Sequence, residues 1–206
     1  MRVAADTPDA PRRRGPYRKS GARRREILDA AFEVFSTAGF RAGSLKDVAG
    51  RIGIDASTIL HHFGSKEALL RAVLEDKQVR DSGPDLESLE PAEVPHGLLK
   101  LAERNDRVPG LISLYAVLSA ESTTADHPGA EYFRERAART RDAFRYGFER
   151  MAGENLLAPG VSASYAAEST FALWDGIQVH WLIDPDSVRV TEVLRQHLRL
   201  ITVVSV

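Results

Sequence analysis

The 206-residue chain contains no cysteine. Disulfide bonds, thiolate metal ligands and a cysteine nucleophile are therefore excluded, and this composition fits a reducing compartment. No phosphate-binding glycine loop, paired-carboxylate spacing or Ser/His/Asp arrangement stands out either. The six histidines follow no recognisable metal-ligand spacing; they are His61, His62, His96, His127, His180 and His197. We therefore expect no cofactor and no bound metal.

Long hydrophobic runs are also missing. The longest nearly apolar stretch, 111–120, is interrupted by Ser113 and Ser119 and is far shorter than the roughly 20 residues of a membrane span. The N-terminus is rich in arginine, but no apolar segment follows it, as a secretory signal would require. These features predict a soluble cytoplasmic protein with no membrane partner.

Charge is unevenly distributed along the chain. Residues 1–25 hold nine lysines and arginines against two aspartates, a charge of +7, so the rest of the chain carries −8 of the overall −1. A basic segment of this kind favours a polyanionic partner, although a solvated tail would look the same. Residues 1–19 also contain Pro8, Pro11, Gly15 and Pro16 without apolar periodicity, which predicts a flexible basic arm.

From Ser20 onward, apolar residues recur with helical spacing, and no segment alternates convincingly with a period of two. The fold is therefore expected to be all-α. The pattern predicts helices near 21–38, 45–52, 56–63, 66–80, 95–104, 107–122, 128–152, 162–183 and 186–203. Gly39 is a candidate C-cap for the first of these, and the proline- and acid-rich stretch 81–94 is expected to be a loop.

The last two predicted helices carry a surplus of apolar surface. Segment 162–183 is apolar almost all round, and 186–203 has one apolar stripe. Asp184 is expected to cap the final helix, with Pro185 at its first position. So much apolar surface at the end of the chain predicts an interface with a second copy, formed by about 162–183 and 186–203.

Residues 44–63 have the features of a helix-turn-helix. Ser44 and Asp47 can form a capping box, and Asp55 can cap the second helix. Gly53 falls in the turn, where a positive φ is easy only for glycine. Ala49 and Ile59, ten residues apart, are placed to pack where the helices cross. The alternative interpretation is an ordinary αα-corner within a helical protein.

The same segment resembles the TetR family of transcriptional regulators. The resemblance covers about residues 20–75 and is carried by three stretches, which are Ile27-Leu28-Asp29-Ala30-Ala31 with Phe35 and Gly39-Phe40, Ser44-Leu45-Lys46-Asp47-Val48-Ala49, and Gly53-Ile54-Asp55-Ala56-Ser57-Thr58-Ile59-Leu60-His61-His62-Phe63 with Ser65-Lys66-Glu67-Ala68-Leu69-Leu70. Two departures are Leu60, where the family usually has tyrosine, and Gly64, where it often has proline.

The resemblance implies a helix-turn-helix DNA-binding domain over 20–66 and a helical ligand-binding and dimerisation domain over 67–206. The helix at 56–63 is expected to enter the major groove. We expect base-facing side chains from Ala56, Ser57, Thr58 and Leu60, and phosphate contacts from Ser44, His61, His62 and Lys66. Arg12–Arg14 are expected to reach the adjacent minor groove.

The amphipathic pattern of the second half also suggests a ligand pocket, although a plain hydrophobic core would explain most of the same residues. The candidates are Tyr115, Leu118, Phe133, Phe148, Trp174, Gln178 and Trp181. Glu121, near a helix end, would recognise a cationic ligand or be solvated.

Together these observations predict a regulator, most often a repressor in such families. It would bind a palindromic DNA operator as a homodimer and leave it when a small-molecule effector binds. Two other classes stay open at this point, a sequence-tolerant architectural DNA binder and, with less support, an all-α enzyme.

Overall fold

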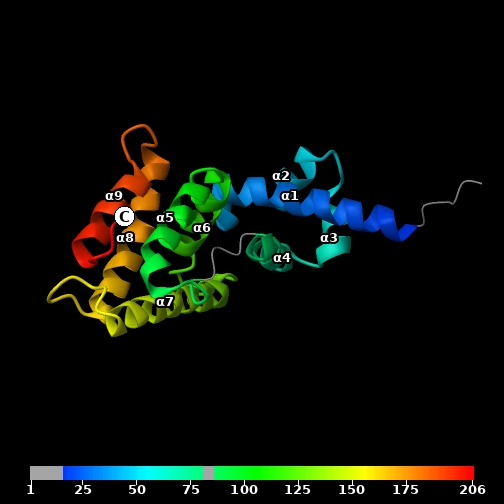
Figure 1. Ribbon diagram of the computed structural model, residues 1–206. Helices are drawn as coiled ribbons and strands as arrows, with labels where there is room; N and C mark the ends of the chain where they lie inside the picture. The colour runs from blue at the N-terminus through cyan, green and yellow to red at the C-terminus, as the bar shows by residue number, and fades with distance from the viewer. Residues whose placement is uncertain (1–15, 81–85) are drawn as a thin grey trace, which may run out of the picture.

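The structure is a computed structural model that describes residues 16–80 and 86–206, and the elements found there are helical (Figure 1). They are α1 (Pro16–Ala42), α2 (Leu45–Arg51), α3 (Ala56–Phe63), α4 (Lys66–Arg80), the 3-10 turn η1 (Pro91–Glu93), α5 (Val94–Asn105), α6 (Pro109–Glu121), α7 (Ala130–Gly153), α8 (Ala163–Ile183) and α9 (Val190–Ile201). The expected all-α fold is confirmed for these residues, in which one isolated bridge, Leu157 to Thr202, is the only β pairing.

The first helix starts earlier than the sequence pattern predicted. It begins at Pro16, so residues 16–19 are helical and do not belong to an arm. Proline suits this position because its ring fixes φ near the helical value and it has no N–H to leave unpaired. The remainder of the expected arm, with Arg12–Arg14, lies outside the described residues. At the other end Gly39, with φ 74° and ψ 178°, interrupts the helix two turns after Phe32.

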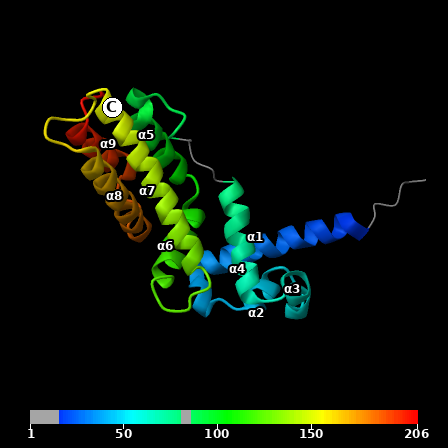
Figure 2. The same cartoon turned by 90° about the horizontal axis from the view of Figure 1, so that it is seen from below.

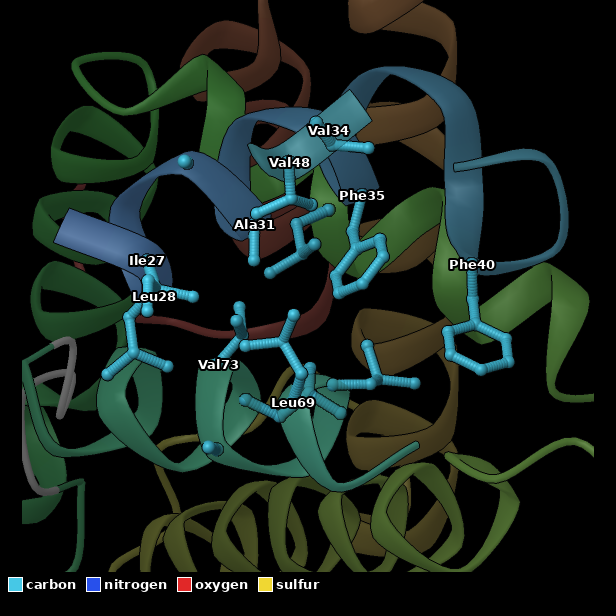
Figure 3. Close-up of a cluster of buried hydrophobic side chains, with 14 of the residues drawn as sticks. Ile27, Leu28, Ala31, Val34, Phe35, Phe40, Val48, Leu69 and Val73 are labelled. Atoms are coloured by element: carbon cyan, nitrogen blue, oxygen red, sulfur yellow. The ribbon is translucent and has the colours of Figure 1, made fainter. Parts of the chain in front are cut away.

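A first hydrophobic cluster joins the N-terminal helices to part of the second half. Figure 3 shows side chains of α1, among them Ile27, Ala31 and Phe35, pointing toward Leu69 and Val73 of α4. Ala49 of α2 and Ile59 of α3 belong to the same cluster, as do Leu111, Leu114 and Leu118 of α6 and Phe133 of α7. The cluster therefore contains residues from both sides of the expected domain boundary at residues 66–67, because α6 packs along α1.

A second cluster fills the space between α5, α7, α8 and α9. Its fully buried members include Leu98, Phe148, Met151 and Leu194. Figure 2 shows α8 and α9 on the outer side of this bundle, away from α3, so one end of the molecule holds the helix-turn-helix and the other holds the C-terminal helices.

The last helix is shorter than expected, and the predicted cap is wrong. α8 ends at Ile183 and α9 begins only at Val190, with Arg189 at its N-cap position. Asp184 instead caps a separate turn: its carboxylate accepts a hydrogen bond from the Ser187 N–H at 3.3 Å, and its carbonyl accepts one from Val188. An aspartate followed by proline stabilises either arrangement, because it caps a single turn as readily as a helix.

In the part of the chain that the structure describes, no helix combines the length and the apolar composition needed to span a membrane.

Candidate functional site

Local hydrogen bonds fix the two short helices at 44–63. The Ser44 hydroxyl accepts a hydrogen bond from the Asp47 N–H at 3.2 Å, and the Asp47 carboxylate accepts one from the Ser44 N–H at 2.9 Å. The predicted capping box is therefore confirmed. Asp55 caps α3 by accepting from the Ser57 N–H at 2.8 Å, as predicted. The hydrogen bonds from Ser44 lower the pKa of the Asp47 carboxyl, and those from Ser57 lower the pKa of Asp55.

The turn and the helix crossing also match the sequence prediction. Gly53 has φ +63°, and the Ile54 N–H donates to the Ala49 carbonyl at 3.1 Å, which closes the turn. Ala49 and Ile59 are both buried in the first cluster. With Ile59 anchored inside, the opposite face of α3 is directed away from the core.

Of the residues expected to meet DNA, that outer face holds Ser57, Leu60 and His61, whereas Ala56 packs against the first cluster. Ser57 and His61 are exposed, Leu60 is 44% exposed, and Ala56 and Thr58 are half-buried. The large apolar side chain of Leu60 lies outside the first hydrophobic cluster. A protruding apolar residue beside hydroxyl groups suits contact with thymine methyl groups and base edges.

The expected phosphate-contacting residues differ in their surroundings. His61 is exposed, and its ring centroid lies 5.7 Å from that of the half-buried His62. The Ser44 hydroxyl already donates to Asp47 at 2.6 Å. The Lys66 Nζ lies 4.4 Å from the centroid of the Phe40 ring and 3.5 Å from the Arg41 carbonyl oxygen. His61 is thus exposed on α3, whereas the Ser44 hydroxyl and the Lys66 ammonium also make contacts within the domain.

The sequence pattern missed two arginines that hold this unit together. The Arg24 guanidinium lies over the Phe63 ring at 4.9 Å, which connects α1 to the end of α3. Arg51 of α2 forms a salt bridge with Glu33 of α1. Neither pairing is visible in the sequence, because both depend on the angle at which α1 crosses the short helices.

A cavity of about 390 Å³ lies between α6, α7 and α8. This volume falls in the range of small-molecule sites, which are typically apolar with a few polar groups. Its lining residues are Ile112, Tyr115, Ala116, Ser119, Ser122, Thr123, Ala130, Phe133, Arg134, Arg136, Ala137, Phe171, Trp174, Asp175, Gln178 and Val179. A smaller cavity of about 200 Å³ adjoins it and shares Ile112, Tyr115, Arg136 and Trp174.

Four of the seven expected pocket residues line the larger cavity: Tyr115, Phe133, Trp174 and Gln178. The other three do not. Leu118 is fully buried in the first hydrophobic cluster and Phe148 in the second, while Trp181 borders a separate hollow near Val190. Helical periodicity finds buried aromatic faces, but it does not distinguish a wall of a cavity from a filled core.

Glu121 takes neither of the roles considered from the sequence. Its carboxylate accepts hydrogen bonds from the backbone N–H groups of Phe40, at 2.8 Å, and Arg41, at 3.3 Å. The buried His127 places its Nε2 3.5 Å from the same carboxylate, while its Nδ1 accepts from the Gly129 N–H at 3.1 Å. The end of α6 is thus attached to the interruption of α1 at Gly39.

This attachment lies beside the cavity. Ser119, Ser122 and Thr123, on the last turn of α6 and just after it, line the cavity, and Glu121 reaches from the same turn toward α1. One short piece of chain therefore contacts both the cavity and the helix that supports the helix-turn-helix.

Sequence comparisons match both halves of the chain. The family described as bacterial regulatory proteins, tetR family, matches residues 27–73, and the C-terminal domain of BetI-type transcriptional repressors matches residues 101–203, half of the chain. The transcriptional regulator UidR of Escherichia coli is 44% identical over 57 residues. That match spans 28% of this chain and only 29% of the length of UidR.

Solved structures share the whole fold. A TetR-family regulator from Agrobacterium tumefaciens superposes with a TM-score of 0.74 at 19% identity, covering 89% of this chain and 99% of that one. A regulator from Saccharomonospora viridis in complex with choline gives 0.68 at 22% identity, covering 87% and 94%. With a helix-turn-helix at 44–63, a helical second half and family matches over both, the chain belongs to the TetR family of transcriptional regulators.

Proposed function

We propose that this regulator is a repressor: a homodimer that binds a palindromic operator through α3 and leaves it when a small molecule occupies the cavity between α6, α7 and α8. The observation that carries the proposal is α3 itself. Its buried Ile59 anchors it to the core, while Ser57, Leu60 and His61 remain exposed for a DNA groove. We propose that the protein acts in the cytoplasm, where the DNA is, and that its activity is regulatory and not catalytic.

The exposed apolar side chains support the homodimer. Most of the large ones among the described residues lie on α8, on α9 and just after it, and they are Tyr165, Val179, Ile183, Val193, Leu200 and Val203. Ile183 and Leu200 are 76% and 75% exposed. A soluble protein rarely leaves such a patch uncovered, and a two-fold dimer would bury it against itself. Two recognition helices about 34–36 Å apart would then fit successive major grooves.

Footprinting on the DNA flanking the gene tests the proposal. A dimeric repressor protects one discrete palindrome, whereas an architectural DNA binder coats the duplex broadly. Light scattering on the purified protein should give twice the chain mass of 22.7 kDa. A monomer at micromolar concentration, or protection without a boundary, would contradict the proposal.

The orientation of α3 has its own test. Replacing Thr58 with valine should change the preferred bases and cost about 1–3 kcal/mol at particular positions, because a base contact is lost. Replacing Lys66 with alanine should weaken all sites equally and reduce the salt slope by about one, because a phosphate contact is lost. Titrations of operator variants at several salt concentrations distinguish the two effects, and the reverse assignment would show that α3 lies differently in the groove.

A further inference from the structure

Arg136 of α7 occupies an unusual position in the effector-binding half. Its side chain is half-buried and lines both the 390 Å³ cavity and the adjoining 200 Å³ cavity. The guanidinium lies over the Tyr115 ring, 4.3 Å from its centroid. An aromatic face holds a guanidinium in place but leaves its N–H donors available in the plane of the group.

Three of the five other arginines of α7 have a carboxylate partner that Arg136 lacks. Arg139, Arg141 and Arg145 are exposed, and each has a carboxylate within 4.0 Å, from Glu135, Glu168 and Asp142 respectively. Among the residues that the structure describes, no carboxylate lies within that distance of Arg136, although it is the more buried group. A partly desolvated cation with no carboxylate at salt-bridge distance is incompletely compensated, so an anion that entered the cavity would find a preformed partner.

The remaining charges of the cavity do not cancel this cation. Asp175 also borders the cavity: burial raises the pKa of its carboxyl, and the nearby charge of Arg136 lowers it, so the two groups interact without forming a salt bridge. Arg134 is exposed. The charged groups of the lining sum to +1, and Arg136 is the one among them whose residue is half-buried. Around it, Phe133, Phe171 and Trp174 provide apolar walls.

We propose that the effector is an organic anion, a carboxylate on an aromatic or aliphatic body, and that Arg136 binds the carboxylate. The planar guanidinium fork matches a carboxylate with two parallel hydrogen bonds, and the body packs against Phe133, Phe171 and Trp174. The proposal rests on the proposed effector function. The proposed ligand differs in charge from that of the Saccharomonospora viridis regulator, which is bound to choline, a quaternary cation. A fixed guanidinium would repel such a cation.

Three probes with one ring system and different charges test the inference on the full-length protein. They are naphthalene-2-carboxylate, the neutral naphthalene-2-carboxamide and the cation (naphthalen-2-yl)trimethylammonium, each titrated by calorimetry. The carboxylate should bind about tenfold or more tightly than the amide, because hydrogen bonds to a charged group contribute more, and the cation should bind most weakly. Equal or tighter binding of the cation, or no binding of the carboxylate, would overturn the proposal.

Variants locate the effect at one side chain. Arg136→Met keeps the apolar stem and should weaken carboxylate binding about tenfold or more while leaving amide binding nearly unchanged. Arg139→Met is the matched control, because it removes an exposed charge from the same helix outside the cavity lining, and it should bind as the unaltered protein does. Circular dichroism checks folding. If Arg136→Met fails to fold, the three probes on the unaltered protein still decide.

A DNA-release assay separates this inference from the proposed function. Displacement from the operator by the cation, with no effect of the carboxylate, would leave the repressor proposal intact and refute the anionic effector. Tight binding of the carboxylate without release from DNA would support the anion site and contradict its role as the effector site.

Discussion

Replacing Glu121 with alanine tests how the second half of the molecule is attached to the DNA-binding helices. The substitution removes the acceptor for the Phe40 N–H at 2.8 Å and for the Arg41 N–H at 3.3 Å. It also leaves the buried His127 Nε2 without its neighbouring carboxylate. Two other hydrogen bonds join these segments, from Arg41 Nη2 to the Thr124 hydroxyl at 2.7 Å and from the Ser113 hydroxyl to the Ser36 carbonyl at 2.7 Å, but neither satisfies the N–H groups of Phe40 and Arg41.

The expected loss of stability follows from these contacts. A hydrogen bond to a charged acceptor contributes about 1.5–3 kcal/mol, and the bond at 2.8 Å should contribute more than the one at 3.3 Å. We therefore expect Glu121→Ala to lower the free energy of unfolding by about 2–4 kcal/mol. Glu121→Gln keeps one neutral acceptor and should cost about half as much.

Urea denaturation at a fixed protein concentration measures these differences, since dimer stability depends on concentration. Glu135→Ala is the control, because Glu135 forms an exposed pair with Arg139 at 3.5 Å on the surface of α7. Such pairs contribute about 0–1 kcal/mol. If Glu121→Ala cost no more than Glu135→Ala, the attachment of α6 to Gly39–Arg41 would have no structural importance.

Three further predictions concern other parts of the chain. Gly39→Ala should destabilise the protein by about 1–3 kcal/mol, because φ is +74° and the new Cβ would lie 2.5 Å from the Glu121 carboxylate. Gly50→Ala is the control: it adds a Cβ in open space within α2 and should be neutral or stabilising in the same urea assay. The helix caps Asp47 and Asp55 have pKa values lowered below the ordinary 3.8. Their contribution to the stability of the fold is therefore complete above about pH 4 and is lost as the pH falls through the lowered pKa values. If both residues are replaced by asparagine, the urea midpoints measured at pH 5 and at pH 3 should differ less than they do in the unaltered protein. Ile183→Glu should weaken the proposed dimer at least about tenfold in light-scattering dilution series, because it places a charge in an apolar interface, and an unchanged dimer would exclude α8 from that interface.

The helix-turn-helix was predictable in detail because its determinants are local. Ser44, Asp47 and Asp55 cap helices through hydrogen bonds to residues two or three positions away, and Gly53 has a positive φ for a reason contained in the turn itself. Hydrogen bonds between residues so close in the chain can be predicted from the sequence alone. The spacing of Ala49 and Ile59 then fixed how the two helices cross.

The cavity and its connections were only partly predictable because they depend on contacts between distant segments. Glu121 and Phe40 are 81 positions apart, and nothing near either residue indicates that they meet. Phe148 and Trp174 follow the same apolar periodicity, yet one is enclosed in a core and the other borders a cavity. Arg136 is one of many charged residues in the segment 128–152, and its burial depends on how α6 and α8 pack around α7, which the sequence does not indicate.

The last turn of α6 explains how an effector could act on DNA binding over such a distance. Ser119 and Ser122 line the cavity, and Glu121 on the same turn accepts hydrogen bonds from the backbone N–H groups of Phe40 and Arg41. A ligand shifts a conformational equilibrium only by its difference in affinity for the two states. Under the proposed function, the effector therefore binds more tightly to a form in which this turn, and with it the end of α1, has moved. Because α1 and α3 share the first hydrophobic cluster, such a displacement would change the position of α3. Under the proposed function, a ligand that filled the cavity without moving the turn would bind and leave the protein on its operator.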